Sequence, residues 1–345
     1  MKGIQQERLE KYFEAEIEGA QAPLHISLIP GGHSNLTYLV EDALGTQRVL
    51  RRPPTGAILA TAHDMAREHR ILAALVDSNV PVPRPIALCE DESINDAPFY
   101  VMDFVEGLVL TGPEQTDREV PLASRERLGM HVIEVLAQLH NIEPSDVGLG
   151  DLGRREAYLA RQLGRWKTQW EKSKTRELEL MDEAHRELEA RMPEQQGAAI
   201  VHGDYRMGNF LTNGVSGRVE AVLDWELCTL GDPLADIGYL MNDWNQPGDS
   251  RPTASGTGLS ATSYGGFPKR EILLARYEEL TGNTTHQVDY YRAFQYWRLA
   301  AIVEGVLSRY KLGVMGGDAD TDAFQNQVDA LAGAAVDLLR SGDLV

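Results

Sequence analysis

Three polar residues near the middle of the chain have the types and spacing that phosphoryl transfer requires. Asp204 is followed five residues later by Asn209, and Asp224 comes fifteen residues after that. Phosphoryl transfer needs a carboxylate that accepts the proton of the attacking hydroxyl, and oxygen ligands that hold Mg²⁺ against nucleotide phosphates. Asp204 is therefore the candidate base, and Asn209 and Asp224 are the candidate metal ligands. Because Asp and Asn are also common turn residues, ordinary loops are the alternative interpretation.

The elements around these residues are predicted to position them. Short apolar or β-branched runs predict strands at 198–201, 210–212 and 219–223. Asn213-Gly214 and Ser216-Gly217 mark a hairpin turn between the last two strands. The base and the amide then lie on a loop that leads into the hairpin, and Asp224 lies where the hairpin ends. Folding back of the chain would bring the three residues together.

The sequence VHGDYRMGNF, followed by LDWE, resembles the catalytic loop of the aminoglycoside phosphotransferase and choline kinase family. In that family HGD replaces the HRD of protein kinases, and D-[FW]-E replaces DFG. The resemblance implies an α+β, bilobal, protein-kinase-like fold that uses ATP and Mg²⁺. Residues 1–105 would form an N-terminal antiparallel β-sheet lobe with one helix that binds the nucleotide. Residues 106–345 would form a larger, mainly helical lobe for catalysis and substrate binding.

The N-terminal segment contains a glycine-rich turn between two predicted strands. The strands are expected at 25–29, 36–41 and 47–51, and the turn is Gly31-Gly32-His33-Ser34-Asn35. Backbone N–H groups of such a turn can bind nucleotide phosphates. The resemblance places Gly32, Ser34 and Asn35 at this nucleotide site. An ordinary hairpin has the same composition and is the alternative.

The lysine that protein kinases carry on the third strand is missing, since no lysine occurs between Lys11 and Lys167. Arg51, at the end of the third predicted strand, is the candidate replacement because arginine keeps its charge and contacts phosphate bidentately. A helix predicted over 62–76 contains Glu68, where kinases place the glutamate that pairs with the strand cation. A solvated arginine and an exposed helix glutamate are the alternatives.

A further strand, expected at 98–104, is followed by Gly107. In the resemblance this strand is the hinge between the lobes. Backbone groups of Asp103 and Val105 would contact the adenine edge, and Met102 would line the adenine pocket. This assignment depends on the order of the elements along the chain.

The C-terminal part is predicted to be helical. Helices are expected at 124–140, 154–173, 175–191, 269–280, 288–312 and 321–339, and another begins after Asp232-Pro233. In the family, Asp236 of that last helix supports the catalytic loop. The stretch 246–266 is rich in Gly, Ser and Thr and is a candidate substrate lid. Arg298 lies in a helix that lines the acceptor pocket in relatives, which makes an anionic acceptor one possibility.

Composition limits the functional classes. The chain has 345 residues, 43% hydrophobic and 25% charged, as in globular proteins with a sizeable core. It has no apolar run of about 18 residues and no apolar signal core, so no membrane span and a cytoplasmic location are expected. The net charge of −19 argues against nucleic-acid binding. The two cysteines, Cys89 and Cys228, are expected to be reduced thiols.

The resemblance implies an acceptor that is a small molecule with a hydroxyl group, and it leaves several acceptors open. VLRRPP, VGLGDLGRREAYLARQ and LCTLGDPLADIGYL look most like the kinase-like domain fused to certain acyl-CoA dehydrogenases and its stand-alone bacterial relatives. That likeness implies a hydroxyacyl-CoA or hydroxy-acid acceptor. An aminoglycoside acceptor, suited to an acidic protein, and a catalytically silent nucleotide-binding pseudokinase, suggested by the missing lysine, are the alternatives. A monomer and a homodimer are both compatible with the sequence.

Overall fold

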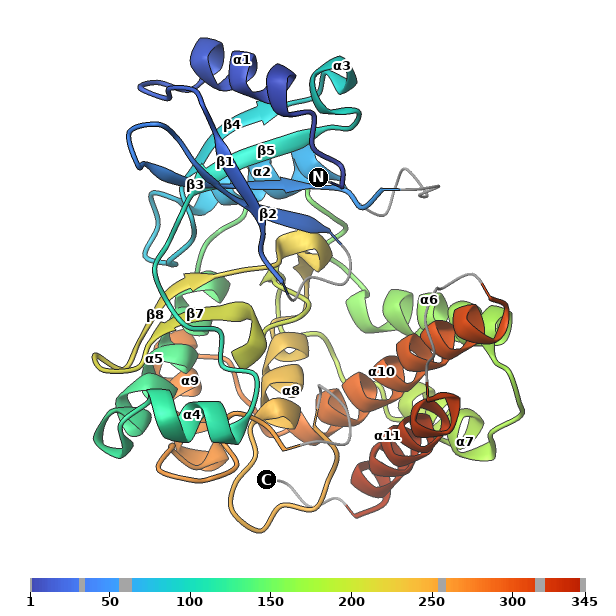
Figure 1. Cartoon of the computed structure of the whole chain (residues 1–345). Helices are drawn as coiled ribbons and strands as arrows, with labels where there is room; N and C mark the ends of the chain where they lie inside the picture. Colours follow the sequence, from blue (N-terminus) through green and yellow to red (C-terminus); the bar gives the residue numbers. More distant parts are fainter. Residues whose placement is uncertain (1, 31–34, 56–63, 254–258, 314–319, 342–345) are drawn as a thin grey trace. The chain divides into compact units, whose positions relative to one another are not determined.

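The computed structural model describes residues 2–30, 35–55, 64–253, 259–313 and 320–341 (Figure 1). The chain divides into two compact units. The first unit consists of Met1–Gly107 and Glu220–Glu226, and the second of Leu108–Val219 and Leu227–Val345. The short segment before residue 227 therefore belongs to the unit formed by the N-terminal residues.

The first unit is built on a five-stranded antiparallel sheet in the order β1-β2-β3-β5-β4 (Figure 1). Its strands are β1 His25–Leu28, β2 Leu36–Glu41, β3 Gln47–Arg52, β4 Pro85–Cys89 and β5 Phe99–Asp103. Side chains alternate between the two faces of a strand. Leu50 of β3 packs into a core cluster with Leu9 and Phe13 of α1 (Gln6–Glu16). Arg51, the next residue, therefore points to the opposite face.

That opposite face carries α2 (Met65–Leu75), which begins three residues after the start of the helix predicted there. Asp64 caps the helix, and its side chain accepts a hydrogen bond from Arg67 N at 2.9 Å. The buried side of α2 contains four apolar residues and Glu68. The carboxylate of Glu68 thus faces the protein interior, as a partner of the strand arginine must.

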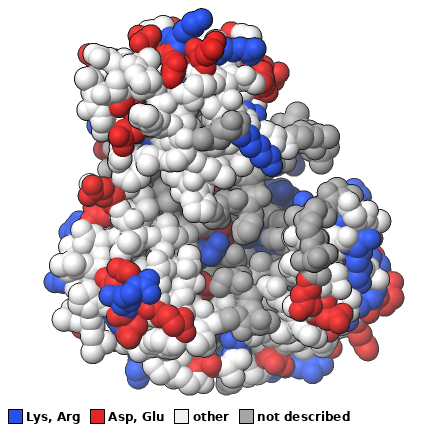
Figure 2. All heavy atoms as spheres, in the orientation of Figure 1, with Lys and Arg blue, Asp and Glu red and all other residues white. Residues whose placement is uncertain are grey.

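One end of the first unit is covered by α1 and the four-residue helix α3 (Glu92–Asn95), which contact each other. Charged side chains crowd this end of the unit (Figure 2). The pattern follows the amphipathic sequence of α1, in which Leu9 and Phe13 are buried while most of the charged residues are exposed.

The second unit is mainly helical. Its helices are α4 Pro113–Glu119, α5 Leu122–His140, α6 Tyr158–Ser173, α7 Glu179–Ala190, α8 Leu234–Asp243, α9 Arg270–Thr281, α10 Val288–Lys311 and α11 Thr321–Ser341. The long helix α10 packs against α6, α7, α8 and α11 (Figure 1). Every residue of α8 is buried. None of the helices in the described part of the chain has the length and apolarity needed to cross a membrane.

The strands near the candidate catalytic residues are short. β6 (Ala199–Val201) pairs with β9 (Thr229–Gly231), and β7 (Phe210–Asn213) pairs with β8 (Arg218–Val222). The predicted hairpin is therefore confirmed. The strand β9 and the helices α3 and α4 were not predicted. The helix α4 starts with a proline in its first turn and buries Pro113 and Thr116.

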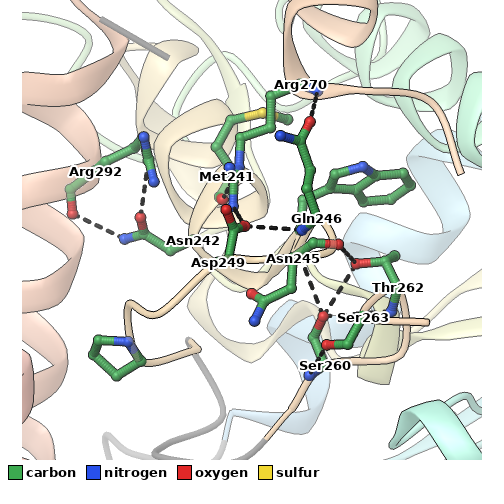
Figure 3. Close-up of polar contacts among 12 residues, drawn as sticks. Met241, Asn242, Asn245, Gln246, Asp249, Ser260, Thr262, Ser263, Arg270 and Arg292 are labelled. Carbon is green, nitrogen blue, oxygen red and sulfur yellow. Dashed lines mark hydrogen bonds and ion pairs between the residues drawn. The ribbon is translucent and has the colours of Figure 1, made fainter. Parts of the chain in front are cut away.

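The described part of the stretch 246–266 is irregular but firmly attached at both ends (Figure 3). Ser260 Oγ accepts a hydrogen bond from Asn245 N at 3.3 Å, and Thr262 Oγ1 donates one to Asn245 O at 2.9 Å. At the start of α9, Arg270 N donates to the side chain of Gln246 at 2.8 Å. These bonds join the residues that follow α8 to Ser260 and Thr262 and to the first residue of α9, so a lid motion of these described residues would have to break them.

Candidate active site

In the first unit, Arg51 joins two carboxylates. Its Nε donates to Glu68 Oε2 at 2.8 Å, and its Nη2 donates to Asp224 Oδ1 at 2.6 Å. The predicted pair between Arg51 and Glu68 is therefore present. The planar guanidinium of arginine has several N–H donors in fixed directions, so it makes both contacts at once. A lysine ammonium would hold the two carboxylates in a less well-defined geometry. The side chains of Arg51 and Glu68 are only 12% and 3% exposed, so the pair is largely shielded from solvent.

Glu68 is surrounded by hydrogen-bond donors. Tyr100 Oη donates to Oε2 at 3.1 Å, and Asn35 Nδ2 donates to Oε1 at 3.0 Å. Burial raises the pKa of Glu68, and the nearby guanidinium of Arg51 opposes that rise. Burial also raises the pKa of Tyr100, which keeps its hydroxyl a proton donor. Asn35 Nδ2 lies 3.3 Å from Glu226 Oε2 as well, so it links the helix glutamate to the LDWE segment.

Asp224 has an unusual backbone conformation. Its φ of 66° falls in the left-handed region, which Asp tolerates better than most residues. The segment is held by Val222 N, which donates to Pro81 O at 2.8 Å, and by Trp225 Nε1, which donates to Val222 O at 3.0 Å. The Asp224 side chain is 30% exposed, and no described residue donates to its Oδ2. One carboxylate oxygen of Asp224 is thus available to a cation.

The structure describes three of the other five candidate nucleotide-site residues. Gly32 and Ser34 lie outside the described residues. Met102 is buried in β5, and Val105 follows that strand half-buried. The N–H of Asp103 already donates to Arg84 O at 2.9 Å, which leaves only its carbonyl for a nucleotide base. Contacts of these residues with adenine remain predictions.

In the second unit, the loop that carries Asp204 is fixed by Asp236 of α8. The carboxylate of Asp236 accepts hydrogen bonds from His202 N at 2.7 Å and from Gly203 N at 2.8 Å. The prediction that Asp236 supports the loop carrying Asp204 is confirmed. Gly203 has a φ of +85°, and a Cβ there would lie 2.9 Å from Leu227 O, so only glycine fits this turn without displacement.

Asp204 and Asn209 are in direct contact. Asn209 Nδ2 donates to Asp204 Oδ2 at 2.7 Å and to the Asp204 carbonyl at 2.8 Å. Arg206 Nε lies 3.3 Å from the other carboxylate oxygen, Oδ1. The Asp204 side chain is 19% exposed, so a substrate hydroxyl can reach it. No described residue donates to Asn209 Oδ1, which leaves that oxygen for a cation.

Four residues near this loop were not assigned to it from the sequence: Arg206, Tyr239, Asp243 and Arg298. Burial, together with the charge of Asp204, raises the pKa of Tyr239. Burial also raises the pKa of Asp243 to about 6, although Arg206 opposes the rise. Tyr239 and Asp243 follow Asp236 at steps of three and four residues along α8, which places all three on one face of the helix. The sequence shows the spacing of these three residues, but it does not show that this face of α8 packs against the loop carrying Asp204.

The described residues of neither unit supply a complete set of protein ligands for a metal ion. Among the described residues, no group of three or more His, Cys, Asp or Glu side chains is arranged to hold a metal ion. Mg²⁺ usually takes one or two protein carboxylates and completes its shell with phosphate and water oxygens. Asn209 Oδ1 in the second unit and Asp224 Oδ2 in the first are each an oxygen to which no described residue donates.

Comparison with known proteins identifies the family. Residues 25–265 match the family model described as "Phosphotransferase enzyme family". The chain belongs to this family. The resemblance based on HGDYRMGN and LDWE is thereby confirmed, and the transferase class of this phosphotransferase follows from it.

The relatives of the phosphotransferase include much longer proteins. It is 34% identical over 312 residues to acyl-CoA dehydrogenase family member 10 of Mus musculus, covering 90% of this chain and 29% of that protein. It is 32% identical over 340 residues to acyl-CoA dehydrogenase family member 11 of Homo sapiens, covering 96% of this chain and 42% of that protein. The phosphotransferase thus spans less than half the length of these relatives.

Solved structures confirm the fold. A protein of Ralstonia eutropha JMP134, provisionally named an aminoglycoside phosphotransferase, is 31% identical with a TM-score of 0.82, and 98% of each chain is covered. Choline kinase of Cryptosporidium parvum has a TM-score of 0.67 at 14% identity, with 97% of each chain covered. The predicted protein-kinase-like α+β fold is therefore confirmed for this phosphotransferase.

Proposed function

We propose that this phosphotransferase moves the γ-phosphate of ATP to a hydroxyl group of a small molecule. The observation that carries the proposal is the environment of Asp204. Its carboxylate is partly exposed, and its two oxygens contact Asn209 and Arg206. Use of a nucleotide is supported by the likeness in fold to an ADP-bound aminoglycoside phosphotransferase, APH(2'')-Ib, and to the amicoumacin kinase hAmiN in complex with AMP-PNP and Ca²⁺.

In this reaction, Asp204 accepts the proton of the acceptor hydroxyl. The hydroxyl oxygen then forms a bond to the γ-phosphorus, the bond from that phosphorus to the β–γ bridging oxygen breaks, and ADP leaves. Arg51 contacts the nucleotide phosphates through its guanidinium, while Glu68 holds the arginine in place. Asn209 and Asp224 would hold Mg²⁺, which when bound neutralises charge on the phosphates. Positioning supplies most of the rate enhancement, because this transfer needs little covalent help from the protein.

We assign nucleotide binding to residues 1–105 together with the LDWE segment, and acceptor binding to residues 106–345. The first set carries Arg51, Glu68 and Asn35, and the second carries Asp204 and Asn209. Gly32, Ser34, Met102, Asp103 and Val105 complete the proposed nucleotide site. A cytoplasmic location and a monomeric or homodimeric state remain predictions from the sequence.

The acceptor proposed is a hydroxyacyl-CoA or a hydroxy acid. Its support is the similarity, over at least 90% of this chain, to proteins named acyl-CoA dehydrogenase family members 10 and 11. An aminoglycoside is the competing acceptor, because the solved protein that is 31% identical to this chain is provisionally named an aminoglycoside phosphotransferase. A screen with radiolabelled ATP that compares hydroxyacyl-CoAs and hydroxy acids with kanamycin-type sugars separates the two.

The catalytic assignment is tested by Asp204→Ala. The variant should lose phosphoryl transfer by at least about a hundredfold, as expected for a lost general base, while its affinity for ATP changes little. Asp146→Ala, which changes an exposed aspartate of the same unit, is the control and should retain full turnover. Full turnover in Asp204→Ala would remove Asp204 from the mechanism. If the unaltered protein binds ATP but transfers phosphate to no hydroxyl compound, the pseudokinase alternative holds instead.

A further inference from the structure

One buried arginine of the second unit, Arg298, differs from the others because it lacks an ion pair with a described carboxylate. The arginines of this unit that are less than one-tenth exposed are Arg125, Arg270, Arg292 and Arg298. The first three form ion pairs with Asp117, Asp249 and Asp289, respectively. Arg298 is only 7% exposed, and within the described ranges no carboxylate forms an ion pair with it. No carboxylate among the described residues therefore lies within ion-pair distance of its guanidinium.

The guanidinium of Arg298 is nevertheless held in a defined place. Its Nη2 donates to Gly203 O at 3.0 Å, and its Nη1 donates to Gln295 Oε1 at 2.8 Å. Its Cζ lies 5.5 Å from the ring centroid of Trp166 and 5.8 Å from that of Tyr239. Two aromatic faces stabilise a cation only in part. Three of the five N–H donors have no acceptor among the described residues.

Arg52 of the first unit shows how an arginine can be buried without an ion pair. Its N–H groups donate to the carbonyl oxygens of Pro53, Gly3 and Asn95, so the fork is occupied by acceptors. Among the described residues, Arg298 has one carbonyl oxygen and one side-chain amide oxygen as acceptors. A buried cation with unused donors is costly unless a ligand supplies the missing oxygens. The planar fork of arginine fits two oxygens of a carboxylate, or a carbonyl oxygen, particularly well.

We propose that Arg298 binds the acyl oxygen of the phosphoryl acceptor, next to the base Asp204. The inference rests on the proposed function and specifies its substrate class. Arg298 donates to the carbonyl of Gly203, the residue immediately before Asp204, so an oxygen bound to its remaining N–H groups lies a few bonds from a hydroxyl at Asp204. A hydroxy acid presents a carboxylate there, and its thioester presents a carbonyl. The ammonium groups of an aminoglycoside would be repelled by this cation.

The test compares acceptors with and without an acyl oxygen. The acceptors are 2-, 3- and 4-hydroxybutyrate, their coenzyme A thioesters, and butanediols that lack the acyl group. Arg298→Met should lower kcat/KM for the acyl-containing acceptors about 10- to 100-fold more than for the diols, which is the range expected for a lost charge-assisted hydrogen bond. The free acids and the thioesters show whether a carboxylate or a carbonyl is bound.

Arg165→Met is the matched control. Arg165 also lies over the Trp166 ring, at 5.3 Å, but its side chain is exposed. Its loss removes a cation from the same indole and should change kcat/KM by less than about twofold for every acceptor, as for an exposed charge. A loss in Arg165→Met equal to that in Arg298→Met would show that general charge near the site, and not the buried fork, is responsible.

Arg298 has a structural contact too, and Arg298→Lys separates the two roles. Lysine can still donate to the Gly203 carbonyl but lacks the fork. If Arg298 binds the acyl oxygen, the lysine variant regains turnover of the diols but not of the hydroxybutyrates. If Arg298→Met and Arg298→Lys lower the turnover of both acceptor types by the same factor, Arg298 only orients the catalytic loop and the proposal is overturned.

A binding measurement keeps this inference distinct from the proposed function. Hydroxybutyrate should raise the Tm of the unaltered protein and of Arg165→Met, but not that of Arg298→Met. If no phosphate is transferred to any acceptor but this stabilisation is present and requires Arg298, the proposed function fails and the acyl-oxygen site stands. If hydroxybutyrates and their thioesters neither stabilise the unaltered protein nor accept phosphate, the site is overturned.

Discussion

Replacement of Asp243 by asparagine should stabilise the phosphotransferase at neutral pH. Asp243 ends α8 and is only 3% exposed. Burial, opposed by Arg206, raises its pKa from the ordinary 3.8 to about 6. The folded protein therefore binds this proton more tightly than the unfolded chain does. The stability that the proton provides is complete below the unfolded pKa of 3.8 and is lost as the pH rises through about 6.

The size of the effect follows from the two pKa values. A pKa raised from 3.8 to about 6 corresponds to about 3 kcal/mol in total, since each pKa unit is worth about 1.4 kcal/mol. Between about pH 5 and about pH 8, roughly 1.4 kcal/mol of this should appear as lost stability in the unaltered protein. Asparagine carries no charge to desolvate, and its Oδ1 can still accept the hydrogen bond from Met207 N–H.

Urea unfolding at the two pH values measures the difference. The free energy of unfolding of Asp243→Asn should exceed that of the unaltered protein, and the gap should widen with pH. Asp249→Asn is the control, because the ion pair with Arg270 lowers the pKa of Asp249 despite partial burial. Asp249 is then ionised in both the folded and the unfolded chain at both pH values, so the stability difference between that variant and the unaltered protein should not change with pH. If Asp243→Asn is less stable than the unaltered protein at about pH 8, attraction to Arg206 outweighs the cost of burial and the reasoning is refuted.

Three further outcomes are expected. Gly238→Ala should destabilise the protein by about 1–3 kcal/mol, because the added Cβ would lie 2.6 Å from the backbone of α10. Gly333→Ala, whose Cβ would have no atom within 4 Å, should stabilise the protein by about 0.5–1 kcal/mol. Equal unfolding midpoints of the two variants would contradict the expected difference. Gly203→Ala and Gly148→Ala both place a side chain at positive φ, but only the former has a backbone atom within 3 Å, so only it should lose phosphoryl transfer. Glu68→Gln should raise the KM for ATP roughly tenfold and leave the KM for the acceptor unchanged in steady-state assays; a rise in both would indicate a general structural role.

The contacts that the sequence predicted are those within a motif. Asn209 binds Asp204 because five residues of loop and one turn of 3₁₀-helix bring the amide back to the carboxylate. The pair of Arg51 and Glu68 was predictable because alternation along β3 and the apolar stripe of α2 each fix which face a residue occupies. In both cases local geometry leaves few alternatives.

What the sequence did not predict depends on packing between distant segments. The face of α8 that carries Tyr239 and Asp243 is apparent from the spacing, but its contact with the catalytic loop depends on how α8 packs in the second unit. The charge balance of Arg298 depends on which carboxylates pack nearby and which do not. The helices α3 and α4 have four and seven residues, too few for propensity or periodicity to mark them.

The path of the chain has a consequence for engineering this family. After Gly107 the chain leaves the first unit, returns for Glu220–Glu226, and leaves again. Those few late residues supply Asp224 and Glu226, the acidic partners of Arg51 and Asn35. An excised N-terminal fragment would therefore lack half of its own ion network and should fold poorly. Recombination that exchanges the sheet-bearing unit between homologues would need a second, distant crossover to carry the returning peptide along with it.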